Sequence, residues 1–357
     1  MNEAPAPRYA ADELFRFALG LVQAAGCRAD IARDVAEVLL EGDLLGHSTH
    51  GLALLAPYLT ELAKNRMAKS GEPTVLSRRA ATQLWDGQRL PGPWLVRRAL
   101  EAATSMARTA GSGTVVIRRS HHIACLAAYL RRATDEGLVA IIESSDPTVA
   151  AVAPHGGRTA FITPNPIAAG LPTSGDPILI DVSTSITSMG YALQQMRAGK
   201  ELPGAWLIDA EGNPTADPRA LVKEPKGALL PLGGLDAGHK GFALALLVEA
   251  LTAGLAGHGR AEPPEGWTGT TLVQVLDPEA FGGLAAFRRQ MDTVAAAARS
   301  ATPRPGVDRV RLPGERGLAH YRDALERGVP LYPKILPALA EWAGKYGIAM
   351  PVARRPG

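Results

Sequence analysis

The chain has 357 residues, 46% of them hydrophobic, so it can bury a sizeable core in one or two domains. Its 38 Lys and Arg against 35 Asp and Glu leave a formal charge of +3, which with 5% aromatic residues argues against a nucleic-acid partner. Only two cysteines, and neither an export signal nor an apolar run long enough to span a bilayer, favour a cytoplasmic protein with no membrane partner.

The first 70 residues are expected to form a helical module. Apolar residues recur at helical spacing over residues 12–25, 30–43 and 51–64. The third of these helices would begin just after His50, where its macrodipole favours an anionic ligand.

Beyond residue 71 the pattern changes to short strand-like runs that alternate with helices, which is typical of an α/β fold. The Pro- and Gly-rich residues 261–269 are expected to be a surface connection. A helical segment over residues 311–357 is expected to return to the N-terminal module, and residues 71–310 form the α/β region. The expected strands are 82–85, 114–117, 138–142, 178–182, 206–209 and 271–276, and the expected helices are 94–110, 123–136, one after Ser185, 242–255 and 281–300.

Two histidine-containing islands, residues 46–51 and 119–122, hold four of the eight histidines. Because histidine titrates nearest neutrality, these islands are the first place to look for proton transfer. Taken alone, each histidine would more commonly cap a helix or fill a core. The spacing His47-x-x-His50, with His121 or His122 as a third ligand, would suit a metal, but no carboxylate has matching spacing, and no metal is expected.

The usual nucleotide-binding motifs are absent. Gly111-Ser112-Gly113 lacks the third glycine of a dinucleotide fingerprint, and His239-Lys240 stands where a P-loop requires Lys followed by Ser or Thr. A Rossmann domain is therefore disfavoured.

Three other segments offer groups for a nucleotide, although each could be an ordinary turn or cap. Asp181 to Ser185 follows an apolar strand and would present hydroxyls and backbone N–H groups. Lys240, between glycines before an apolar helix, could approach a phosphate. The turn of residues 163–166 leaves the Asn165 amide as a directional donor and acceptor, and residues 313–315 form a further turn.

In this order, the islands resemble the malate/L-lactate dehydrogenase family, whose members bind NAD(P) without a Rossmann fold. The matching pieces are Gly46 to Gly51 followed by Tyr58, Ser120-x-His122, residues 165–168, Asp181 to Ser185, Gly238-x-Lys240-Gly241 and Pro313-Gly314-Glu315. The resemblance implies a non-Rossmann α/β fold, in which an N-terminal helical module lies beside a sheet-based cofactor-binding lobe. It also implies a homodimer with active sites near the subunit interface.

The resemblance also assigns roles to residues. Its serine-histidine pair falls on Thr49 and His50, and its second active-site histidine on His122. Substrate contacts would come from Ser48, Leu54 and Tyr58. Contacts to NAD or NADP would come from Ser145, Asn165, Asp181, Ser183, Thr184, Lys240, Gly241, Pro313, Gly314 and Glu315.

Two departures from the family bear on the substrate. Leu54 stands where many members have an arginine that holds the substrate carboxylate, and Leu45 replaces another frequent arginine. Leucine offers no donor, so a bidentate clamp is lost there.

The leading hypothesis is hydride transfer between nicotinamide and C2 of a 2-oxo or 2-hydroxy acid. His122 is favoured as the acid/base, with His50 and Thr49 orienting the substrate. One alternative is an NADPH-dependent cyclic imine reductase, in which an apolar pocket would account for Leu45 and Leu54. Another is a histidine-bound metal hydrolase or a non-enzymatic binder.

Overall fold

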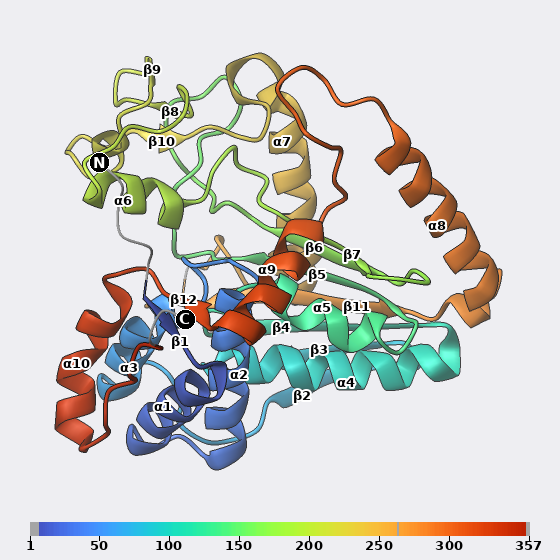
Figure 1. Ribbon diagram of the computed structural model, residues 1–357, viewed down its shortest axis with the longest axis horizontal. Helices are drawn as coiled ribbons and strands as arrows, with labels where there is room; N and C mark the ends of the chain where they lie inside the picture. Colours follow the sequence, from blue (N-terminus) through green and yellow to red (C-terminus); the bar gives the residue numbers. More distant parts are fainter. Residues whose placement is uncertain (1–6, 263, 355–357) are drawn as a thin grey trace.

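The computed structural model describes residues 7–262 and 264–354, so parts of all three predicted segments, residues 1–6, 263 and 355–357, lie outside the described residues. It has a mixed α/β architecture with a central sheet, helices on both of its faces and a smaller lobe at one end (Figure 1). The α/β class predicted from the sequence is confirmed.

Helices form the N-terminal part of the molecule. They are α1 (Ala11–Ala24), α2 (Ala29–Leu44) and α3 (Leu55–Ala63), the last preceded by the 3-10 turn η1 (Leu52–Leu54). Their apolar stripes meet in a core that includes the fully buried Leu14, Ile31 and Leu59. The expected helical periodicity is therefore present over all three stretches, because each buries one face against the other two.

The C-terminal segment contacts this helical module. Helix α9 (Glu315–Arg327) packs on α2, and α10 (Ile335–Tyr346) packs on α1 and α3. The strands β1 (Arg8–Tyr9) and β12 (Val329–Pro330) pair antiparallel and join the two ends of the chain.

The central sheet has seven strands in the order β2-β3-β4-β11-β5-β6-β7, antiparallel throughout except for the β3–β4 pair. Helices α4 (Gly92–Ala110) and α5 (Ala127–Thr134) cover one face (Figure 1). The other face carries α7 (Gly234–Glu249) and its π-helical continuation η3 (Ala250–Gly254). The strands are β2 (Thr74–Arg78), β3 (Thr82–Asp86), β4 (Ser112–Ser120), β5 (Val139–Ser145), β6 (Ile167–Leu171), β7 (Ile178–Val182) and β11 (Gly269–Leu276).

A smaller lobe forms around a three-stranded sheet of order β10-β8-β9, with its own apolar cluster. Its elements are α6 (Met189–Arg197), β8 (Leu207–Ile208), β9 (Pro214–Thr215), the 3-10 turn η2 (Pro218–Leu221) and β10 (Ala228–Leu229). After β11 and the short turn η4 (Pro278–Ala280), helix α8 (Leu284–Ser300) runs along the outside of the molecule, at the right in Figure 1.

Several expected boundaries differ from the structure. The helix expected over 123–136 begins only at Ala127, because Ala124 has the left-handed φ of 60° and interrupts it. Helix α7 begins at Gly234 instead of residue 242, with non-helical dihedrals at Ala237. The helix expected after Ser185 begins only at Met189. The Ser188 hydroxyl caps it by accepting a hydrogen bond from the Tyr191 amide.

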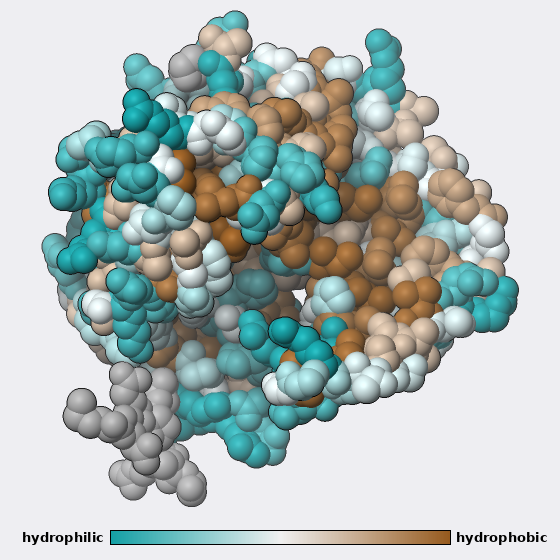
Figure 2. Space-filling view, turned by 90° about the horizontal axis from the view of Figure 1, so that it is seen from above, coloured by the Kyte–Doolittle hydropathy of each residue, from teal (hydrophilic) through white to brown (hydrophobic). Residues whose placement is uncertain are grey.

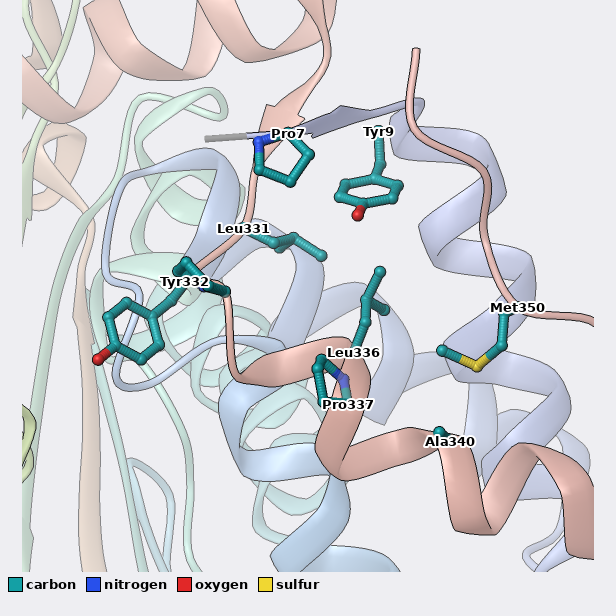
Figure 3. Close-up of a pocket in the computed structure, with 9 residues that line it drawn as sticks. Pro7, Tyr9, Leu331, Tyr332, Leu336, Pro337, Ala340 and Met350 are labelled. Atoms are coloured by element: carbon teal, nitrogen blue, oxygen red, sulfur yellow. The ribbon is translucent and has the colours of Figure 1, made fainter. Parts of the chain in front are cut away.

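An apolar cavity of about 370 Å³ lies where the two chain ends meet α10. Figure 3 shows Tyr9 and Met350 facing Leu336 and Pro337 across it. None of the predicted site residues lines this cavity. Among the described helices, none is both long and apolar enough to cross a membrane.

Candidate active site

The first histidine island is a tight turn between α2 and η1 that backbone contacts hold in place. The His47 amide donates to the Gly42 carbonyl over 2.8 Å, and the Leu52 amide donates to Asp43 Oδ2 over 2.6 Å. A Cβ on Gly51 would overlap the Asp43 carboxylate, so a glycine is required there. Burial raises the pKa of this carboxyl to about 7. Asp43 and Gly51 thus fix the position of His50.

The second island is held by side chains and by one backbone amide. The His122 ring nitrogen Nδ1 lies 2.9 Å from the Tyr58 hydroxyl and 3.2 Å from the Ala124 amide, which donates to it. Tyr58 also donates to the His122 carbonyl over 2.9 Å. The left-handed backbone at Ala124 turns its amide toward the ring.

The two islands, about seventy residues apart in the sequence, meet in space. The rings of His50 and His122 stack with centroids 6.0 Å apart and an interplanar angle of 23°. Both residues are half-buried. The Thr49 hydroxyl lies 2.9 Å from Nδ1 of His50. Each imidazole therefore has a neighbouring hydroxyl at Nδ1 that can either donate or accept a hydrogen bond.

Burial favours the neutral form of both rings. It lowers the pKa of His122 well below its usual range, and the nearby His50 and His121 rings lower it further. Burial also lowers the pKa of His50, which the Asp181 carboxylate partly offsets. Two neutral imidazoles at neutral pH can donate hydrogen bonds to a ligand oxygen and exchange protons when charge develops on it.

The adjacent His121 has a different environment. Its side chain is fully buried, and neither ring nitrogen has a hydrogen-bond partner among the described residues. Its closest charged neighbour is Glu61, at 3.8 Å from Nε2 to Oε2, and burial lowers the pKa of His121 to about 4. His121 therefore belongs to the packing behind the site, while His122 faces the site.

The structure adds one aromatic residue to the site. The Trp267 ring lies 4.7 Å from the His122 centroid and 5.0 Å from that of His121. The sequence places Trp267 in a Pro- and Gly-rich connection expected to lie on the surface. The sequence signal that could have indicated its position is a large aromatic residue within such a connection, because burial of an aromatic side chain is favourable.

Three of the segments expected to bind the cofactor come together. The Leu232 amide donates to the Thr184 carbonyl, and the Gly241 amide donates to the Leu232 carbonyl, so the Asp181 to Ser185 segment lies beside the start of the helical stretch that contains Lys240. The Lys240 side chain is exposed and forms no ion pair within the described part of the chain. The Pro313 carbonyl accepts from the Leu179 amide on β7, which brings residues 313–315 to the same strand as Asp181.

Other expected site residues are engaged within the protein. Ser145 is buried, with its hydroxyl 2.8 Å from Thr252 and 2.7 Å from Thr270. Asn165 is fully buried and donates to the Ala245 carbonyl and to Glu249.

Glu315 pairs with Arg299 of α8 over 2.6 Å. Tyr58, expected to contact the substrate, is fully buried and contacts His122 instead. The polar side-chain atoms of Ser145, Asn165 and Tyr58 thus have protein partners, whereas Glu315 bonds through Oε1 and its Oε2 makes no hydrogen bond among the described residues.

The residues that lie near His50 in the sequence differ in exposure. Ser48 and Leu54 are half-buried in the first island and in η1. Leu45 is buried and its carbonyl lies against Gly317, so an arginine there would have to enter the helical core. Gly190 at the start of α6 lies against Thr49, which places the small lobe beside the first island.

A family model described as malate/L-lactate dehydrogenase matches residues 9–340. An L-lactate dehydrogenase of Cupriavidus necator is 33% identical over 332 residues, which cover 91% of this chain and 94% of that protein. A Δ1-pyrroline-2-carboxylate/Δ1-piperideine-2-carboxylate reductase of Pseudomonas syringae pv. tomato is also 33% identical, over 89% and 91% of the two chains. The solved structure of malate dehydrogenase from Pyrococcus horikoshii superposes with a TM-score of 0.88, at 27% identity over 98% of both chains.

Proposed function

Since this chain belongs to the malate/L-lactate dehydrogenase family, and is thus a dehydrogenase or reductase that acts on CH–OH or C=N groups, we propose that it transfers hydride between a nicotinamide cofactor and C2 of a 2-oxo or 2-hydroxy acid. The observation that carries this proposal is the stacked pair of His50 and His122. The family offers no support for the alternatives of a metal hydrolase or a non-enzymatic binder.

The residues around Lys240 fit a dinucleotide. A phosphate needs a cation, and the exposed Lys240 offers one, three residues after the non-helical Ala237 in α7. When bound, NAD or NADP supplies or accepts the hydride. The protein holds the phosphates through Lys240 and Gly241, and the ribose through Asp181, Ser183 and Thr184.

We assign acid/base catalysis to His122, because its surroundings accommodate two protonation states. With Nδ1 unprotonated, the ring accepts the Ala124 N–H. With Nδ1 protonated, the ring donates to Tyr58, whose own proton goes to the His122 carbonyl. The Ala124 N–H pairs with an unprotonated Nδ1 and the Tyr58 hydroxyl with a protonated one. The surroundings of the ring therefore do not hold Nδ1 in a single protonation state. Hydride arrival at a carbonyl carbon places charge on oxygen. The His122 ring, once it has taken up a second proton from solvent, stabilises this charge through Nε2–H and then transfers that proton, which leaves the neutral ring with its proton on Nδ1.

His50 is assigned to substrate orientation, with Thr49 holding its ring. The only hydrogen bond of this ring among the described residues is the one with the Thr49 hydroxyl, whereas the His122 ring has two hydrogen-bonding neighbours at Nδ1. A ring held by one hydrogen bond can adapt to the shape of a ligand. Ser48 and Leu54 flank it and contribute to the substrate pocket.

The substrate of this chain is bulkier than pyruvate or lacks a carboxylate near Leu54. This proposal rests on the half-buried Leu54, which offers no donor where many family members have an arginine that holds the substrate carboxylate. Leu54→Arg should therefore improve kcat/KM for pyruvate by about tenfold, the value of a charge-assisted hydrogen bond. A steady-state assay that finds no gain would mean that the carboxylate is held elsewhere; Arg118 and Arg119 are already paired with Asp86, which leaves Arg197.

A reductase of cyclic imine carboxylates is the second candidate. It is supported by the 33% identity to such a reductase, which equals the identity to the L-lactate dehydrogenase. Cyclic imines carry an apolar ring that leucine side chains can contact.

The decisive experiment is a screen of 2-oxo acids, 2-hydroxy acids and cyclic imines, each with both cofactors, followed by NADH or NADPH absorbance. Turnover of a 2-oxo or 2-hydroxy acid supports the first function. Turnover confined to cyclic imines replaces it with the second, and no turnover in any class contradicts both.

The active form is proposed to be a homodimer. Helix α7 exposes Leu244, Leu246 and Leu247 at 40%, 46% and 49%, and hydrophobic residues gather to the right of centre in the view from above (Figure 2). An apolar surface of this kind is typical of a subunit interface. Light scattering should give twice the chain mass, and Leu246→Glu with Leu247→Glu should reduce it to one, whereas Leu325→Glu on α9 should not.

A further inference from the structure

A second group of polar side chains lies near the first histidine island, and of its three members only Asp181 has a role in the proposed function, as a ribose contact. His47, Cys125 and Asp181 each offer one donor atom, a nitrogen, a sulfur and an oxygen, and these atoms all lie within 4.8 Å of one another. We propose that these three residues bind a single Zn²⁺ ion, and that the bound ion prevents Asp181 from contacting the cofactor.

The three ligands come from separate elements that touch one another. His47 lies in the turn after α2, Cys125 in the loop before α5, and Asp181 on β7. The His47 amide is bonded to the Gly42 carbonyl, and a Cβ on Gly42 would lie 3.3 Å from that of Cys125. The Ala127 amide donates to Asp181 over 2.9 Å. The site is therefore largely preformed by backbone packing.

Unused donor atoms remain on these side chains. Neither ring nitrogen of His47 has a hydrogen-bond partner within the described residues, and both contacts of Asp181 use Oδ2, which leaves Oδ1 open. The Cys125 thiol lies 3.8 Å from Asp181 Oδ2 and is 2% exposed. A metal would enter past the half-buried His47 and Asp181 and displace the thiol proton.

The donor set selects the kind of metal. One thiolate, one imidazole and one carboxylate suit a borderline-soft ion such as Zn²⁺, while Mg²⁺ and Ca²⁺ prefer oxygen alone. Tetrahedral zinc places its ligand atoms roughly 3.5 Å apart, so the present spacing closes by about one ångström through side-chain rotation. Three protein ligands leave the fourth position to water.

The site is distinct from the metal arrangement that the sequence spacing alone would suggest. His47 and His50 are three residues apart, yet the group of donor atoms that includes His47 contains Cys125 and Asp181 and neither His50 nor His122. The turn directs His47 toward α5 and β7, and His50 toward His122.

The test uses the full chain, reduced and freed of metal. Zn²⁺ binding is measured by competition with a chromophoric chelator, and Co²⁺ binding by the charge-transfer absorption that only a thiolate ligand produces. Wild type should bind one ion, and His47→Gln and Cys125→Ala should each weaken binding by about 100-fold or more, as expected when a ligand is lost. The exposed His239→Gln is the matched control and should bind as wild type does.

Several results would overturn the site. They are the absence of binding at micromolar Zn²⁺, equal binding by His47→Gln and wild type, absence of the cobalt–thiolate absorption, or loss of binding in His50→Gln instead. Binding requires no turnover, so these results are independent of the proposed reaction.

The effect on the cofactor rests on the proposed function and has its own readout. Saturating Zn²⁺ should weaken NADH or NADPH binding at least tenfold by fluorescence titration in wild type, but not in Cys125→Ala. If cofactor affinity is unchanged while zinc is bound, the metal site stands and its inhibitory role is wrong. If neither cofactor binds even without zinc, the proposed function fails instead.

Discussion

The two histidine islands hold their imidazole rings in different ways. In the second island, Tyr58 and the Ala124 amide contact Nδ1 of His122, and Trp267 packs on its ring. In the first island, backbone contacts fix the turn, and among the described residues only the adjacent Thr49 makes a hydrogen bond to the His50 ring. A ring held by several hydrogen bonds keeps its geometry while its charge changes, whereas a ring held by one hydrogen bond adapts to its ligand. The difference predicts that substitutions in the two islands will affect different kinetic constants.

The largest expected effect is that of His122→Asn. It removes the proposed acid/base group, so kcat should fall by about 100-fold or more. Cofactor affinity, measured by fluorescence titration, should change little. His50→Asn is the matched comparison and should raise KM more than it lowers kcat; equal kcat losses in both variants would erase the distinction between the islands.

The neighbouring His121→Leu tests the packing behind the second island. Because the pKa of buried His121 is lowered to about 4, the folded state holds fewer protons than the unfolded state between about pH 6.5 and pH 4. Wild type therefore loses stability as pH falls through this range, on the order of 2 kcal/mol by pH 5.

His121→Leu lacks the titrating group and does not lose this stability. As pH falls from 8 to 5, the thermal unfolding temperature of the variant should therefore rise relative to that of wild type. A difference that is constant with pH would show that the pKa of His121 is the same in the folded and unfolded states, which contradicts the lowered value.

Tyr58→Phe should have an intermediate effect. It removes the acceptor that protonated Nδ1 of His122 requires while it preserves ring packing, so the charged form becomes less favourable. In the reduction direction, where protonated His122 is the acid, the alkaline limb of the kcat profile should move to lower pH. The value of kcat at pH 7 should fall about tenfold, the energy of one hydrogen bond. An unchanged pH profile with lower thermal stability would instead assign Tyr58 a purely structural role.

The smallest expected effect belongs to Thr49→Val in the first island. The hydroxyl is the one partner of His50 Nδ1 among the described residues, and its loss costs about threefold in KM, within the range of a neutral hydrogen bond. The variant keeps the shape of the side chain. A larger loss than that of Tyr58→Phe, in parallel steady-state assays, would reverse the assignment of rigid and adaptable islands.

Much of the helical architecture could be predicted because helical periodicity is a local property. The stripes of α1 and α2 are present in the sequence as Leu14, Leu21, Ile31 and Leu39, and all four are fully buried. Strand β2 was not expected, since all five of its residues are exposed and show no alternation. Strand β6, Ile-Ala-Ala-Gly-Leu, has few β-branched residues to indicate its position.

The sequence predicts which segments form the site, but it predicts few of the contacts between their side chains. The motif order indicates that His50 and His122 converge, but the left-handed Ala124 that aims an amide at His122 has no signature, since alanine rarely adopts that backbone. The roles of Tyr58, Ser145 and Asn165 as supports depend on burial, which tertiary packing decides. Trp267 likewise reaches the histidines from a segment distant in sequence.

The β1–β12 pair has a consequence for biosynthesis. Tyr9, near the start of the chain, pairs with Val329, and α9 and α10 complete the packing around α1, α2 and α3. Helices α1, α2 and α3 are synthesised well before α9 and α10, and they are enclosed only after these later helices have been made. Until then, their apolar stripes remain available to chaperones during translation.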